Sequence, residues 1–192
     1  MTNISKLVYA VAFQAGWFVC ILAGNLASVI YTLLFLGAHF WFLSYSNKHN
    51  TLRSTPHLSV RKEVLWVMIV LCLGAIVETI YFSAGFLYIG TPKNLFAQVL
   101  LPPIWLLCIW IIFSLALRTC LSFLFYKPTL SYLACLIFVP TNYYAGAKLN
   151  NDVNINEPYF LSLALMTLIW ILCLWCLIHL KRHYFEEIFN AN

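Results

Sequence analysis

The sequence predicts an all-α bundle of transmembrane helices with about six spans, on the basis of its composition, its long apolar runs and the placement of its basic residues. Hydrophobic residues make up 63% of the 192 residues, charged residues make up 9%, and the mean hydropathy is +0.87. A typical soluble domain is about 45–50% apolar and about 25% charged. A chain with so few charged groups cannot cover a water-facing surface, so we expect its helices to face lipid.

Six runs of the sequence are long and apolar enough for a membrane span, which needs about 20 residues of helix. The expected spans are residues 7–24, 26–46, 64–84, 104–126, 129–147 and 158–180. Prolines open the last three, in keeping with the preference of proline for a first helical turn. Because no connecting segment is long enough to form a soluble domain, we expect residues 1–192 to form a single transmembrane domain.

The basic residues set the expected orientation. If the N-terminus is cytoplasmic, eight Lys and Arg residues fall in cytoplasmic segments and two in outer segments, with Arg118 inside a span. This bias predicts that both termini are cytoplasmic. The basic residues lie between apolar runs and form no continuous face, which argues against a nucleic-acid partner.

Other features of the chain lead to narrower expectations. Residues 85–103 are unusually apolar for a connection, so we expect an interfacial or re-entrant segment there. Trp66 and Trp105 lie near span ends and suit an interfacial belt, whereas Trp110 and Trp170 lie deeper and should pack between helices. The sixth expected span has almost no polar residue at depth, which predicts a peripheral position.

Two ionisable residues lie well inside the expected spans, namely Glu78 in the third and Arg118 in the fourth. A charge at such depth costs upward of about 2.5–3.5 kcal/mol, so these residues should face the bundle interior. Helical rise puts their backbones about 9 Å apart in depth, with the side chains leaning toward each other. We expect a stretched or water-bridged contact; a buried pair that only fixes helix register explains the same residues equally well.

Depth along the helices sorts the other polar residues into two layers. The outer layer is expected to hold Glu78, Tyr81, Asn142 and Tyr144, and the inner layer Gln14, His39, Arg118 and Ser122. Pro140 should kink the fifth span and make room between the layers. The sequence thus predicts an intramembrane polar cavity. Its candidate ligand-binding residues are Glu78, Arg118, Asn142, Tyr144, Gln14 and His39.

No catalytic motif is present in the sequence. It contains no nucleophile elbow, no H-E-x-x-H helix and no phosphate-binding glycine loop. His49 and His57 stand in a charged connection, where histidines are solvated more often than metal-bound. We therefore expect no metal and no cofactor, and the question of enzymatic activity stays open.

Four segments carry a resemblance to a known family. They are residues 13–20 (FQAGWFVC), residues 74–85 around Glu78, residues 106–113 and residues 140–149 (PTNYYAGAKL). Together they resemble the small bacterial inner-membrane proteins catalogued as domain of unknown function twenty-eight seventy-eight. The resemblance implies an inner-membrane protein without an assigned activity and, through neighbouring genes for fatty-acid modification, a lipid-linked role. This chain has Arg118-Thr119 about where the family tends to an Asn-His pair.

Three classes of function fit these observations. The first is a protein that binds, or helps to modify, a lipid or other amphiphile in the polar cavity. The second is a small proton-coupled transporter, which Glu78 and Arg118 favour and the lack of visible repeats opposes. The third is a non-catalytic subunit that binds another membrane protein. Membrane lipids are the expected partners in the first class.

Overall fold

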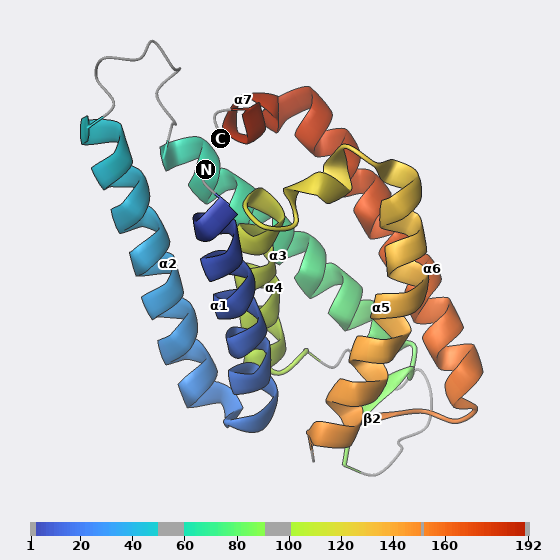
Figure 1. Ribbon diagram of the computed structural model, residues 1–192. Helices are drawn as coiled ribbons and strands as arrows, with labels where there is room; N and C mark the ends of the chain where they lie inside the picture. Colours follow the sequence, from blue (N-terminus) through green and yellow to red (C-terminus); the bar gives the residue numbers. More distant parts are fainter. Residues whose placement is uncertain (1–2, 50–59, 91–100, 151, 191–192) are drawn as a thin grey trace.

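Six long helices form the molecule, as seen in the computed structural model (Figure 1). The structure describes residues 3–49, 60–90, 101–150 and 152–190. The helices are α1 (Asn3–Leu22), α2 (Gly24–His49), α3 (Val60–Ser83), α4 (Ile104–Arg118), α5 (Pro128–Leu149), α6 (Tyr159–Leu180) and the short α7 (Glu186–Asn190). Two short strands, β1 (Leu87–Ile89) and β2 (Val153–Ile155), complete the regular structure with a 3₁₀ turn at Ser122–Phe125 and a π turn at Lys181–Phe185. The all-α prediction is confirmed.

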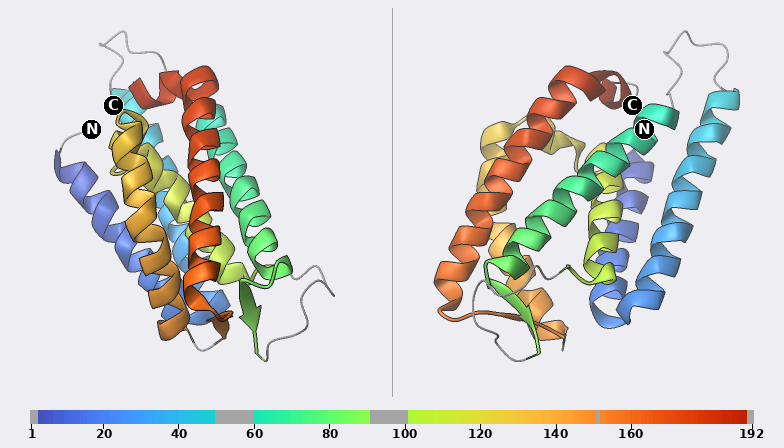
Figure 2. Two further views of the ribbon diagram at one scale, coloured as in Figure 1. Left: turned by 90° about the vertical axis from the view of Figure 1, so that its right-hand side faces the viewer. Right: turned by 180° about the vertical axis from the view of Figure 1, so that it is seen from behind.

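The long helices run up and down between two ends of the bundle. The start of α1, the end of α2, the start of α3 and α7 lie at one end, here called the termini end (Figures 1 and 2). The turn at Gly24 and the β1–β2 ribbon lie at the opposite, ribbon end. Helix α4 packs against α1, α2 and α3, while α5 pairs with α6 and α6 also contacts α3. Helices α3 and α4 therefore form the centre of the fold.

Among the described residues, four helices are long and apolar enough to cross a membrane, namely α1, α2, α3 and the stretch from Tyr159 to Phe185. Helix α4 is apolar but has only 15 residues, and α5 is long but less apolar. The chain therefore has the helices of a membrane protein. The number of spans and the orientation of the termini remain predictions.

The fourth span is shorter than the sequence predicts, because α4 ends at Arg118 and does not continue to Tyr126. Thr119 leaves the helical region, with φ −116° and ψ −90°, and its hydroxyl donates to the carbonyl of Leu115 at 2.7 Å. This side chain competes with the backbone for a helical acceptor, which favours a helix end. At the other end of α4 the Asn25 side chain accepts the backbone N–H of Trp105 at 3.1 Å.

A short ribbon replaces part of the expected interfacial segment. β1 pairs antiparallel with β2, with Leu87 opposite Ile155 and Ile89 opposite Val153. Leu87, Val153 and Ile155 are buried, so the ribbon closes the core at this end. Residues 91–100 lie outside the described part of the chain, and the expectation of a re-entrant segment there stays a prediction.

Three expectations about buried residues need correction. Trp66 and Trp105 are buried and are not interfacial; the Trp66 ring contacts Phe125, Phe185 and Phe189 edge-on. Helix α6 is not peripheral, since Met166, Cys173, Leu174 and Leu177 are buried in the core. The reason is that apolar side chains can pack against helices as well as against lipid, so a lack of polar residues does not mark a peripheral helix.

Candidate functional site

Glu78 occupies a fully buried position on α3, toward the ribbon end. Its Oε1 atom accepts two hydrogen bonds, from the indole Nε1 of Trp110 at 3.0 Å and from the hydroxyl of Tyr143 at 2.5 Å. Its Oε2 atom has no hydrogen-bond partner among the described residues. One oxygen of this buried carboxyl group is therefore available to accept a hydrogen bond from a ligand.

Four helices build the surroundings of Glu78. Trp110 of α4 stacks on Trp170 of α6, with ring centroids 4.6 Å apart and planes 11° from parallel. The indole of Trp170 donates to the Tyr143 hydroxyl at 3.1 Å, which continues the hydrogen-bond chain through α5 to α3. Gly74, one turn before Glu78, admits the Trp110 ring, because a Cβ atom there would lie 2.1 Å from that ring. Local packing therefore fixes the donors of Glu78.

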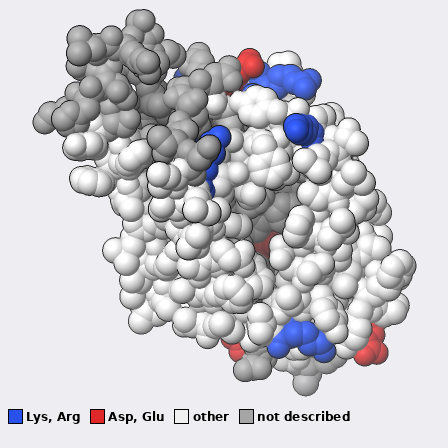
Figure 3. Space-filling view, in the orientation of Figure 1, with Lys and Arg blue, Asp and Glu red and all other residues white. Residues whose placement is uncertain are grey.

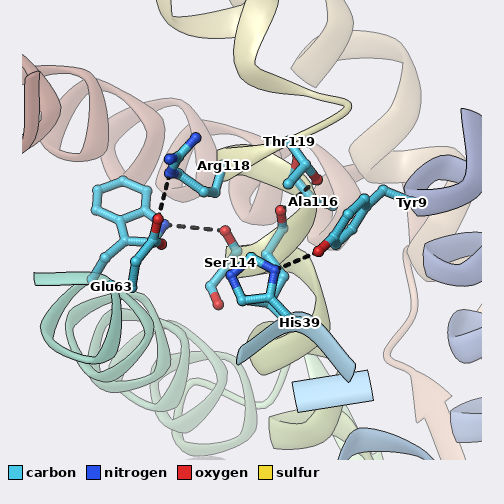
Figure 4. Close-up of polar contacts among 9 residues, drawn as sticks. Tyr9, His39, Glu63, Ser114, Ala116, Arg118 and Thr119 are labelled. Carbon is cyan, nitrogen blue, oxygen red and sulfur yellow. Dashed lines mark hydrogen bonds and ion pairs between the residues drawn. The ribbon is translucent and has the colours of Figure 1, made fainter. Parts of the chain in front are cut away.

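Arg118 pairs with Glu63 and not with Glu78. Its Nε atom lies 2.8 Å from Glu63 Oε1, and both side chains are buried (Figure 4). Glu63 and Glu78 are 15 residues apart on α3, or about 22 Å by helical rise, so Arg118 cannot reach both. The expected contact between Glu78 and Arg118 is therefore wrong. Since α4 ends at Arg118, its last side chain lies at the level where α3 begins.

His39 and Tyr9 lie near this ion pair. The Tyr9 hydroxyl is 2.7 Å from His39 Nδ1, and His39 Nε2 has no hydrogen-bond partner within the described residues (Figure 4). Both residues interact electrostatically with Arg118. The inner polar layer therefore exists with His39 and Arg118 as expected. Its other members are Tyr9 and Glu63, while Gln14 is exposed on α1.

The outer polar layer also differs from the expected one. Glu78 and Tyr81 are buried, and the Tyr81 hydroxyl donates to the Met166 carbonyl at 2.7 Å. Asn142 and Tyr144 are exposed, so they do not share the interior with Glu78. The residue between them, Tyr143, reaches the carboxylate. Whether Asn142, Tyr144 or Gln14 binds a ligand stays a prediction.

Sequence reasoning missed Glu63 and Tyr143. Glu63 directly follows Arg61 and Lys62, and three consecutive charged residues are typical of a solvated helix end. Its spacing carried a signal, because Glu63 shares a three-and-four-residue periodicity with the other buried residues of α3, which are Trp66, Val67, Val70, Gly74, Val77, Glu78, Tyr81 and Phe82. No comparable signal separates Tyr143 from Tyr144.

One face of the bundle is hollowed between α1 and α5, and an acidic side chain is visible on the floor of this hollow (Figure 3). The two helices meet at the ribbon end, where Asn150 Nδ2 donates to the Ile21 carbonyl at 2.8 Å. A Cβ atom on Gly146 would lie 3.5 Å from the Ile21 side chain, which is ordinary contact. The hollow therefore opens above a closed junction of α1 and α5.

Within the described part of the chain, the candidate site is a set of polar groups at two depths. Among the described residues, no group of three or more His, Cys, Asp or Glu side chains is placed to hold a metal ion. Carboxyl, phenol, indole and imidazole groups are present, and these can bind a polar group or move a proton. The arrangement suits binding within an apolar surrounding.

A family model described as a protein of unknown function, DUF2878, matches residues 6–176. This chain belongs to that family. The match runs from the first helix to the sixth and includes Glu63, Glu78, Arg118 and Tyr143. No curated protein and no solved structure matches the chain. The membership, together with the apolar helices, describes a DUF2878 membrane protein.

Proposed function

We propose that this DUF2878 protein binds a lipid or other amphiphile of the membrane, with the polar group of the amphiphile at Glu78. The observation that carries the proposal is the uncommitted Oε2 atom of a fully buried carboxyl group whose Oε1 atom already has two donors. A buried acceptor without a partner costs free energy, and a ligand donor would recover it.

The hollow between α1 and α5 supports a lateral route from the membrane into the bundle interior, where Glu78 is buried (Figure 3). Phe13 of α1 and Phe113 of α4 have ring centroids 6.2 Å apart, and Phe113 also contacts Trp170. These rings offer an apolar surface beside the polar group, as an acyl chain requires. The polar part of the ligand then needs a hydrogen-bond donor, such as a hydroxyl or an amine.

We further propose that the protein is a multi-pass protein of the bacterial inner membrane with both termini in the cytoplasm. This orientation is supported by the basic residues at the termini end of the described chain, namely Lys6, Arg61, Lys62, Lys127, Lys181 and Arg182. Lys148 lies at the ribbon end. Labelling of single cysteines on each side of the membrane tests this orientation.

Native mass spectrometry tests the binding proposal. Dioleoylglycerol, which has one free hydroxyl, is titrated against trioleoylglycerol, which has none. We expect the protein to retain dioleoylglycerol and Glu78→Gln to bind it about tenfold more weakly, because hydrogen bonds to charged groups are the stronger ones. The matched control is Glu186→Gln, because Glu186 is an exposed residue of α7. Equal retention of both glycerolipids, or equal loss in both variants, contradicts the proposal.

A second function, proton-coupled transport, is favoured by one specific observation. Glu63 and Glu78 lie on the same helix at two depths, and each has an oxygen without a partner among the described residues. A proton carrier needs such groups at successive depths. In proteoliposomes, a proton flux that Glu78→Gln abolishes without unfolding the protein would favour transport over simple binding. Co-purification of a stable membrane partner would instead favour a subunit role.

A further inference from the structure

A pocket at the ribbon end lies outside the Glu78 site. It has a volume of about 50 Å³ and is lined by Tyr88, Tyr144, Ala147, Lys148, Asn154, Ile155 and Tyr159. The lining residues come from the end of α5, from both strands of the ribbon and from the start of α6. The ribbon pairs Tyr88 with Asn154, which sets these two side-chain positions beside each other. Five of the seven lining side chains are polar, and one of them carries a positive charge.

The pocket contains the cation of Lys148, and the carboxylate of Glu157 lies near it. Lys148 Nζ lies 5.6 Å from the centre of the Tyr144 ring. The Tyr159 hydroxyl interacts electrostatically with the carboxylate of Glu157, which is not part of the pocket lining. Basic and acidic side chains are both visible along the corresponding lower edge of the molecule (Figure 3). The pocket therefore contains one positive partner, and a negative partner lies beside it next to Tyr159.

The neighbouring surface is apolar and open. Phe160 is 85% exposed and Leu161 is 53% exposed, at the start of α6 directly after Tyr159. Large exposed apolar side chains beside a polar pocket are unusual on a water-facing surface. At the end of a membrane-spanning helix this arrangement matches the boundary between head groups and acyl chains, where tyrosine is enriched.

We infer that this pocket binds the zwitterionic head group of a phosphoethanolamine lipid. Lys148 and the hydroxyls of Tyr88 and Tyr144 donate to the phosphate, and Asn154 supplies a further amide donor. The ammonium group is positioned to reach the Glu157 carboxylate and the tyrosine ring faces. The acyl chains then lie along the apolar surface that begins at Phe160.

The charges at the ribbon end select between head groups. Asp152 and Glu157 both belong to the α5–α6 connection that follows Lys148, so two carboxylates accompany the lysine at the ribbon end. A purely anionic head group gains from Lys148 but is repelled by these carboxylates. A choline head group carries a cation without N–H donors and cannot hydrogen-bond to Glu157. Phosphoethanolamine satisfies both the lysine and the carboxylate.

Native mass spectrometry of the full chain with defined phospholipids tests this inference. We expect retention of phosphatidylethanolamine to exceed that of phosphatidylglycerol and phosphatidylcholine, and Lys148→Gln to weaken it about tenfold. The matched control is Lys127→Gln, an exposed lysine at the opposite end of α5. Equal weakening by the two lysine variants, or equal retention of the three lipids, overturns the inference.

Two further arms separate the remaining explanations. Glu157→Gln should remove the preference for phosphatidylethanolamine over phosphatidylglycerol, and an unchanged preference contradicts the role of the carboxylate. Soluble phosphoethanolamine at millimolar concentration should displace little of the bound lipid; full displacement overturns the assignment to a lipid. The inference does not depend on Glu78, because Glu78→Gln should leave phosphatidylethanolamine retention unchanged while it weakens dioleoylglycerol binding.

Discussion

The two buried carboxylates of α3 occupy opposite kinds of environment. Glu63 has a cation, since Arg118 donates to it at 2.8 Å at the termini end of the bundle. Glu78 has neutral donors, an indole and a phenol, toward the ribbon end. A buried ion pair offsets the desolvation of its two charges, whereas neutral donors compensate a charge only in part. The comparison identifies Glu63 as a structural partner and Glu78 as the better candidate for a ligand.

The largest expected effect comes from breaking the ion pair. Arg118→Met leaves Glu63 buried without its cation, which should lower the free energy of unfolding by about 3–5 kcal/mol. Unfolding by sodium dodecyl sulfate in mixed micelles measures this change. The double variant Glu63→Leu with Arg118→Met should recover most of the loss. A double variant no more stable than Arg118→Met alone would contradict a structural role for the pair.

Gly74→Ala should perturb the Glu78 region and leave the ion pair intact. The added Cβ atom would lie 2.1 Å from the Trp110 ring, so the stack of Trp110 on Trp170 must shift. Such overpacking costs roughly 1–3 kcal/mol. Thermal unfolding in detergent and tryptophan fluorescence measure the effect. Gly37→Ala is the control, because a Cβ atom there meets nothing within 4 Å and should leave stability unchanged or slightly higher.

Tyr143→Phe should have a smaller effect that is confined to the Glu78 region. The variant keeps the ring and removes the hydroxyl that links Trp170 to Glu78, at a cost of about 0.5–1.5 kcal/mol. The measurement is the same unfolding titration. Tyr144→Phe on the exposed neighbour should change stability by less than about 0.5 kcal/mol. Equal effects of the two substitutions would remove Tyr143 from the proposed site.

An effect of similar size is expected at the termini end, from Trp66→Phe. The indole of Trp66 donates to the Ser114 carbonyl at 3.1 Å, one turn before Arg118. Loss of this hydrogen bond should cost about 1 kcal/mol, while the aromatic contacts to Phe125 and Phe189 are largely kept. Arg118 should still pair with Glu63. A loss as large as that of Arg118→Met would show that Trp66 positions the ion pair.

The sequence predicts burial correctly where the chemistry of one side chain is enough to determine it. An ionised or imidazole side chain within an apolar run must face the interior, and Glu78, Arg118 and His39 are all buried. The partners of these residues depend on how the helices are rotated and on where they end. An estimate of depth from helical rise gives neither of these. Thr119 ends α4 early, so Arg118 lies beside the start of α3 and pairs with Glu63.

Aromatic residues show the same limit. Trp110 and Trp170 were expected to pack between helices, and their stacked rings confirm it. These rings also donate hydrogen bonds to Glu78 and Tyr143. This arrangement depends on Gly74 of α3, which leaves room for the Trp110 ring of α4 and so cannot be recognised from the sequence of α3 alone. The choice between Tyr143 and Tyr144 likewise depends on the rotation of α5, which its sequence pattern does not define.

The ribbon of β1 and β2 has a mechanical consequence. Its backbone pairing joins the segment after α3 to the segment before α6, across the 66 positions of sequence that separate Tyr88 from its partner Asn154. A motion that separates α3 from α6 must therefore pivot at the ribbon. Its amplitude is greatest at the termini end. Breathing of the bundle would then expose the Glu63–Arg118 end before the head-group pocket.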